Sequence, residues 1–90
     1  MTTRTVYEWM IEDEYTYKVV ADGEADSLDA AKADVTAASV RLQGSEWLVS
    51  SPTPKRAWIE KQVREYDDGG FTQTGGKSWR LQPNGDWREE

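Results

Sequence analysis

One stretch of this 90-residue chain, Ser27 to Gln43, has the apolar spacing of an amphipathic helix. Its apolar residues recur every three or four positions and form one stripe: Leu28, Ala31, Val35, Ala38 and Leu42. Asp26 or Ser27 can cap the N-terminus, and Gly44 suits the position just past the C-terminus. The remaining segments are typical of strands and turns, so we expect this helix to cover the sheet that they form.

The same helix carries a second, shallower apolar stripe on roughly the opposite side. It consists of Ala30, Ala33, Ala37 and Val40. Alanine is a strong helix former that is well tolerated in water, so the stripe can be ordinary helix surface. Small side chains also let another backbone approach closely, so the stripe can equally be a packing surface for a dimer partner or a target.

Two strands precede the helix. Thr5 to Ile11 and Tyr15 to Ala21 alternate in hydrophobicity, and the acidic run between them predicts a three-residue turn. This turn would place Ile11 opposite Tyr15 and Trp9 opposite Tyr17. The large residues of the hairpin would then share one half-buried face.

The second half of the chain predicts further strands over Glu46 to Ser50, Arg56 to Tyr66, from Phe71 onward, and briefly over Asp86 to Glu89. A four-residue turn before Phe71 gives the pairs Tyr66–Phe71, Arg64–Gln73, Glu60–Lys77 and Trp58–Trp79. Gly75-Gly76 indicates either a bulge or an early end to the first return strand. Asn84-Gly85 is a two-residue hairpin signal that would place Trp87 next to Gln82.

These elements predict an α+β fold, a two-layer sandwich in which one antiparallel sheet packs on one helix. The expected order is β-β-α-β-β-β, with the short strand at the C-terminus as a sixth. Residues 1–90 are expected to form a single domain, because too little chain lies on either side of the proline-rich loop near residue 52 for two cores.

The composition argues against an enzyme. The chain has no cysteine and no histidine, which excludes a thiol nucleophile, a disulfide framework, a thiolate metal site and a histidine base. Gly70 to Ser78 approaches a phosphate-binding loop, but its glycines have the wrong spacing and a strand follows instead of a helix. Neighbouring acids lack the spacing of a calcium loop. We expect no catalytic residues, no cofactor and no metal site.

The net charge of −6 belongs entirely to the first half of the chain. Residues 1–46 hold ten acidic and four basic residues, whereas residues 47–90 hold seven of each. Direct binding to nucleic acid is disfavoured, since phosphate affinity depends on Lys and Arg. Long-range steering favours a protein partner with a basic surface, although acidity can also serve solubility alone.

No apolar run reaches the ~20 residues that cross a bilayer, and no signal-peptide pattern opens the chain. We therefore expect no membrane partner and a cytoplasmic location.

The pattern favours a small protein-binding module. We expect its acidic residues to occupy a basic surface of a nucleic-acid-handling protein: Glu12, Asp13, Glu14, Asp22, Glu24, Asp26 and Asp29. A compact acidic chain of this kind resembles, in type and without a shared motif, the accessory and counter-defence proteins that phages encode. That resemblance implies an inhibitor acting in the host cytoplasm.

Two other functions stay open. A structural or oligomer-forming protein, such as a homodimer, would use the alanine-rich helix face or an open sheet edge. A single-stranded nucleic-acid binder would stack bases on sheet aromatics, among which Trp58, Trp79, Tyr66 and Phe71 lie near basic residues. These rings can instead be the core beneath the helix.

Overall fold

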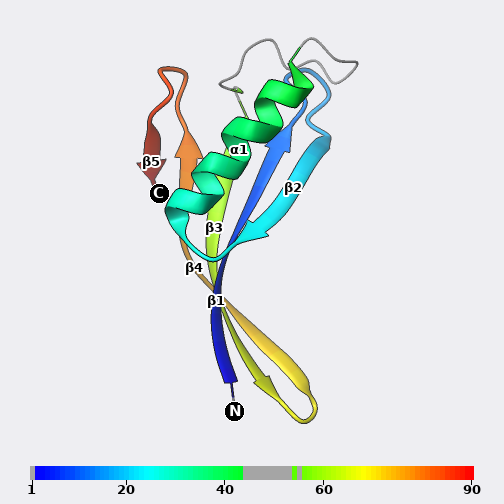
Figure 1. Cartoon of the computed structure of the whole chain (residues 1–90), viewed down its shortest axis with the longest axis vertical. Coiled ribbons are helices and arrows are strands. Elements are labelled where there is room, and N and C mark those ends of the chain that lie inside the picture. The colour runs from blue at the N-terminus through cyan, green and yellow to red at the C-terminus, as the bar shows by residue number, and fades with distance from the viewer. Residues whose placement is uncertain (1, 44–53, 55) are drawn as a thin grey trace.

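The computed structural model describes residues 2–43, 54 and 56–90. Its elements are β1 (Thr2–Glu12), β2 (Val19–Ala25), α1 (Leu28–Leu42), β3 (Ala57–Asp67), β4 (Gly70–Leu81) and β5 (Trp87–Glu89). The five strands form one antiparallel sheet in the order β2-β1-β3-β4-β5, and α1 lies across one face of it (Figure 1). The predicted two-layer α+β class is confirmed. The strand predicted over residues 46–50 and the helix-ending Gly44 lie outside the described residues.

The helix begins where the sequence predicts. Ser27 is its N-cap, and the Ser27 hydroxyl accepts a hydrogen bond from the Ala30 N–H at 3.1 Å. Ala31, Val35 and Ala38 of the predicted stripe are buried. Ser39 is buried beside them, and its hydroxyl donates to the Val35 carbonyl at 2.7 Å, so the polar side chain is satisfied within the helix.

The hydrophobic core lies between α1 and the sheet. It comprises Trp9, Ile11, Ala31, Val35, Ala38, Ala57, Ile59 and Leu81, with Tyr7 and Trp79 packed at its margin. Strand side chains alternate between the two faces, so the odd-numbered positions of β1 and β3 supply this core.

The predicted register of the first hairpin is wrong. Ile11 lies opposite Ala21 and Trp9 opposite Gly23, because β2 does not begin until Val19. The reason lies in Asp13, whose carboxylate accepts the N–H groups of Tyr15 and Thr16 at 2.8 and 3.0 Å. These bonds organise a longer turn than the three residues expected, and the turn leaves Tyr15 68% exposed.

Gly23 lies within β2, and Trp9 explains why a glycine is needed there. A Cβ atom on residue 23 would lie 2.7 Å from the Trp9 ring, closer than packed carbon atoms come. The indole therefore occupies the space that a larger residue would fill. Its Nε1–H finds no hydrogen-bond partner among the described residues.

The second hairpin follows the predicted register only near its tip. Tyr66–Phe71 and Arg64–Gln73 are confirmed, but a bulge between the pairs Glu60–Ser78 and Gln62–Gly75 moves the rest by one residue. Glu60 therefore faces Ser78 rather than Lys77, and Trp58 faces Arg80 rather than Trp79. Of the two alternatives for Gly75-Gly76, the bulge is confirmed.

The C-terminal strand is also displaced by one residue. Trp87 pairs with Leu81, not Gln82, and Gln82 closes the turn with Asp86 through a 2.7 Å backbone hydrogen bond. The turn thus contains three residues instead of two. Pro83 has no N–H to donate to a ladder, and Gly85 takes the positive φ of 93° that the turn requires.

Candidate functional site

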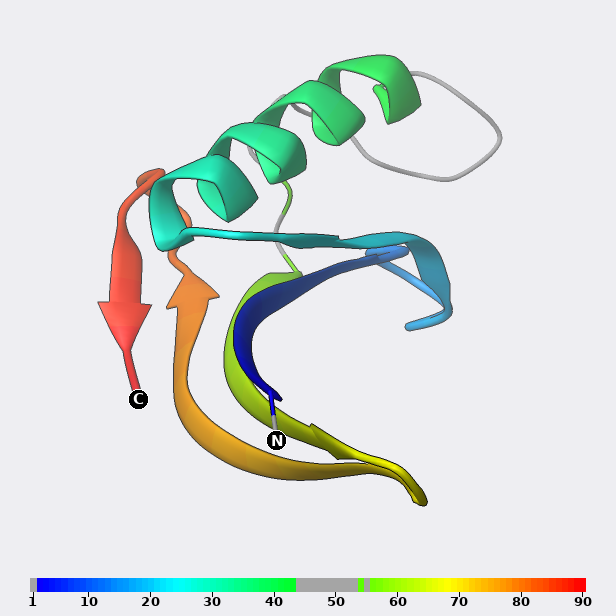
Figure 2. The ribbon, with the colours of Figure 1, turned by 60° about the horizontal axis from the view of Figure 1, so that its bottom comes forward.

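No helix of the described chain packs on the sheet face opposite α1, although Val6 and Gln62, which are cross-strand partners on that face, are buried. Glu8, Met10 and Trp58 lie on this side, because they alternate with the core residues of their strands. Figure 2 shows β1, β3 and β4 curving around an open side that faces away from α1. We call this surface the free face.

Three glutamates form a row across the free face. Glu8 on β1 lies opposite Glu24 of β2 on one side and opposite Glu60 of β3 on the other. Directly opposed residues in a sheet have Cβ atoms about 4.5–5.5 Å apart, and like charges at that spacing repel. We call Glu24, Glu8 and Glu60 the carboxylate row.

Only one member of the row has a countercharge among the described residues. Glu24 Oε1 lies 2.7 Å from an Arg64 nitrogen, and this hydrogen bond holds the pKa of Glu24 below its ordinary value. Arg64 also donates to Gln62 and to Gln73. Glu8 and Glu60 are half-buried and form no ion pair or hydrogen bond with the described residues, so their repulsion is uncompensated.

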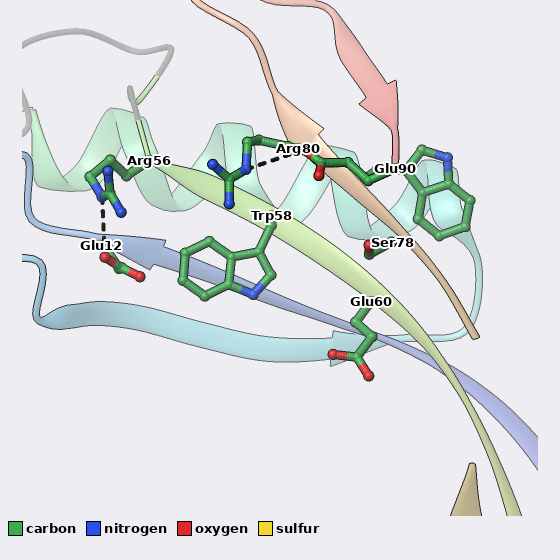
Figure 3. Close-up of a pocket in the computed structure, with 8 residues that line it drawn as sticks. Glu12, Arg56, Trp58, Glu60, Ser78, Arg80 and Glu90 are labelled. Atoms are coloured by element: carbon green, nitrogen blue, oxygen red, sulfur yellow. Dashed lines mark hydrogen bonds and ion pairs between the residues drawn. The ribbon is translucent and has the colours of Figure 1, made fainter. Parts of the chain in front are cut away.

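A cavity of about 240 Å³ lies on the β3–β4 side of the row (Figure 3). It is lined by Glu12, Arg56, Trp58, Glu60, Ser78, Trp79, Arg80 and Glu90. Arg56 pairs with Glu12 at 3.2 Å, and Arg80 pairs with Glu90 at 3.4 Å. The Trp58 ring lies between the Glu12 and Glu60 carboxylates in Figure 3, so the cavity offers an aromatic surface beside an unpaired negative charge.

A second hollow of about 220 Å³ lies on the β2 side, lined by Glu8, Met10, Asp22, Gly23 and Glu24. Glu8 thus borders one cavity and Glu60 the other. Met10 and Trp58 are cross-strand partners, and they place apolar surface next to the carboxylates. The free face therefore combines negative charge with partly exposed apolar groups.

The predicted acidic residues fall into two groups, one before β2 and one after it, with Asp22 and Glu24 within the strand. Glu12, Asp13 and Glu14 precede β2, whereas Asp26 and Asp29 follow it, and seven strand residues separate the groups by about 20 Å. Asp13 is 3% exposed and its carboxylate serves the turn. Glu12 pairs with Arg56, and Asp26 with Arg4 at 3.3 Å. Asp22 and Glu24 lie near Glu8 and belong to the free face.

The alanine-rich stripe lies on the outer surface of α1. Ala30, Ala33, Ala37 and Val40 are all exposed, and Val40 is exposed over 56% of its surface. This placement agrees with both interpretations of the stripe.

The four aromatics proposed as a stacking platform do not share a face. The bulge in β4 turns Trp79 to the helix side, where its ring centre lies 6.1 Å from that of Tyr7. Trp58 remains on the free face, and Tyr66 stacks with Phe71 at the hairpin tip at 5.4 Å. A continuous platform from Trp58 to Trp79 is therefore excluded.

Sequence reasoning missed Glu8 and Glu60 as site residues. Alternation alone places Glu8 opposite the core face, but the pairing of β1 with β3 joins segments about 50 residues apart. No turn signal in the sequence sets that register, so the row could not be found before the sheet order was known.

Comparison of the chain with protein-family models, with curated proteins and with solved structures finds no match. Across residues 2–43, 54 and 56–90, no three acidic side chains are grouped so that they could hold a metal ion, and no helix is long and apolar enough to cross a membrane. The free face is therefore the feature of the described chain from which a function is proposed below.

Proposed function

We propose that this chain is a small protein-binding module whose free face binds a basic surface of a nucleic-acid-handling protein. The observation that supports this proposal is the uncompensated cross-strand pair of Glu8 and Glu60. A cationic side chain bound next to either carboxylate would weaken their repulsion and gain a charge-assisted contact. Relief of the repulsion between Glu8 and Glu60 would thus contribute to the free energy of binding.

The neighbours of the pair favour an arginine or lysine over a small ion. The three glutamates belong to three different strands, and no three acidic side chains of the described residues are grouped so that they could hold a metal ion. Trp58 offers an aromatic ring on which a guanidinium can stack, and Met10 offers adaptable apolar contact. Interfaces of proteins commonly combine such an aromatic anchor with surrounding polar groups.

The sign of the charge supports a nucleic-acid-handling partner. Surfaces that bind phosphates are dense in Lys and Arg, and an acidic face that occupies one excludes the nucleic acid by competition. The module would then act as an inhibitor. Such a role matches the type of phage-encoded accessory protein that the composition resembles.

Direct binding of single-stranded nucleic acid is less well supported. Trp58 has Arg56 and Arg80 nearby, but both arginines are paired with glutamates. With Glu60 included, the cavity carries three acidic and two basic side chains. A phosphate would meet net negative charge there.

The test is affinity capture from a lysate with Glu8→Lys as the discriminating variant. The introduced lysine would lie opposite Glu24 and Glu60 in the sheet and offset their negative charge. We therefore expect the protein to stay folded, while the lysine of the chain itself takes the place of the partner's cation. Asp34→Lys is the matched control, since it changes the charge equally on the exposed surface of α1. We expect the wild type and Asp34→Lys to retain one basic nucleic-acid-handling protein at low salt and to lose it at high salt.

Added oligonucleotide should release that partner, because both would compete for one surface. Glu8→Lys should retain at least about tenfold less of it. Equal retention by Glu8→Lys and the wild type would place the contact elsewhere, and a partner that salt does not release would contradict an electrostatic interface.

A further inference from the structure

One edge of the sheet is open along most of β4. β5 pairs only with Trp79, Arg80 and Leu81, and one more backbone bond joins Glu90 N–H to the Ser78 carbonyl. From Gly70 to Lys77, no strand of the described chain lies on the outer side of β4. The backbone groups on that side are available to another strand.

This open edge lacks the usual protection against pairing. Proteins commonly blunt an exposed edge with charged residues or proline. The segment Gly69 to Gly76 contains neither, and every residue in it is exposed. The opposite edge of the same region differs, because β1 carries Arg4 there, in an ion pair with Asp26. β4 is thus the unprotected edge.

The edge belongs to an arm that projects from the body. Figure 1 shows the β3–β4 hairpin and the start of β1 extending beyond the end of α1. The longest dimension of the molecule is 45 Å, and its radius of gyration is 14.3 Å, against about 12 Å for a compact domain of this length. A small sheet with little apolar cover is marginal in water. Phe71 at the arm's tip is 59% exposed, although its ring lies next to Tyr66 and Arg64.

We propose that β4 pairs antiparallel with β4 of a second copy of this chain, with Thr72 opposite Thr72 of that copy. In this register Gly70 faces Thr74, and Phe71 faces Gln73, of the other copy. The two Phe71 rings become diagonal neighbours about 7–8 Å apart, a spacing that aromatic side chains bridge. Paired threonines are favourable across strands.

The length of the open edge supports the same register. Lys77 lies beyond the paired segment and forms an ion pair with Glu89 of its own chain at 3.2 Å. The second copy's strand would begin at Gly70, opposite Thr74, and would stop short of Ser78, where β5 occupies the edge. A register centred on Gln73 would instead push the acidic turn of one copy toward Glu90 of the other.

The pairing would join the two sheets into one. Its twofold axis would run perpendicular to the sheet, which leaves the free faces of both copies on the same side. The two carboxylate rows would then be presented to one partner together.

Cross-linking tests the register directly, since the chain has no cysteine of its own. Thr72→Cys would place two thiols on the twofold axis, at a Cα separation of about 4.5–5.5 Å that suits a disulfide. Thr3→Cys is the control. Thr3 on β1 and Thr72 on β4 are both cross-strand partners of Glu65 on β3, so they lie at the same level of the arm but on opposite edges of the sheet. We expect Thr72→Cys to form covalent dimers at least about tenfold faster than Thr3→Cys under mild oxidation.

The mass in solution is the second readout. The wild type should change from a 10.3 kDa monomer to a species of twice that mass as concentration rises. Thr72→Lys sets two like charges against each other on the axis, so it should raise the dissociation constant about tenfold or more, whereas Thr3→Lys should leave it unchanged. Three outcomes would each overturn the proposal. The wild type could stay monomeric, or it could form an assembly larger than a dimer. The third outcome is a dimer that Ala33→Glu disrupts and Thr72→Lys does not.

Discussion

Replacing Glu8 by glutamine should make this protein more stable. Glu8 is the central member of the carboxylate row, and glutamine keeps its size while removing its charge. At about 6 Å, two unit charges repel by roughly 0.7 kcal/mol in water and by roughly 2.8 kcal/mol at the effective dielectric constant of a protein surface. Measured cross-strand charge effects fall between about 0.2 and 1 kcal/mol.

The stability gained by Glu8→Gln depends on how strongly Glu24 and Glu60 each repel Glu8. Arg64 already offsets the charge of Glu24 at 2.7 Å, so the Glu8–Glu60 pair dominates. We expect the free energy of unfolding to rise by about 0.5–1 kcal/mol. For a domain of this size, that gain raises the melting temperature by about 2–8 °C.

The assay is thermal unfolding at low salt, repeated at about 1 M salt. Asp34→Asn is the control, because it removes one charge from the exposed surface of α1 and lowers the global repulsion equally. At about 1 M salt the screening length falls to about 3 Å, so the advantage of Glu8→Gln should shrink. A melting temperature no higher than that of Asp34→Asn, or a gain that salt does not reduce, would refute the repulsion and remove the main support for the proposed binding face.

Three further predictions concern single contacts. Gly23→Ala should lower the free energy of unfolding in urea by about 1–3 kcal/mol, since its Cβ would collide with the Trp9 ring; an unchanged midpoint would contradict that packing. Arg64 depresses the pKa of Glu24, so this pair stabilises the fold above the unfolded-state pKa and ceases to do so as the pH falls through the folded-state pKa. The wild type should therefore lose more stability than Glu24→Gln on acidification, and parallel pH profiles would contradict the pairing. Trp58→Ala should weaken binding of the basic partner at least about tenfold while the circular dichroism spectrum is kept; unchanged affinity would remove Trp58 from the interface.

The sequence predicted those parts of the fold that depend on local signals. The helix, its Ser27 cap and its buried stripe follow from periodicity, and Tyr66–Phe71 follows from a short turn with glycines. The predicted strand pairing was wrong where a single residue changes the register of a hairpin. Asp13 lengthens the first turn through its side chain, and the bulge at Gly75-Gly76 rotates Trp79 to the other face. Neither effect has a periodic signature, because each depends on one hydrogen-bonding group or one glycine.

The sheet order also changes how the acidic residues are grouped. Sequence proximity joined Glu12, Asp13 and Glu14 into one surface, yet Asp13 is buried within the turn and Glu12 pairs with Arg56. The uncompensated charge arises between Glu8 and Glu60, which only the sheet order brings together. In the proposed function, a cation supplied by the partner would weaken this repulsion. The stability gain expected for Glu8→Gln and the loss of binding expected for Glu8→Lys are therefore two measurements of one interaction.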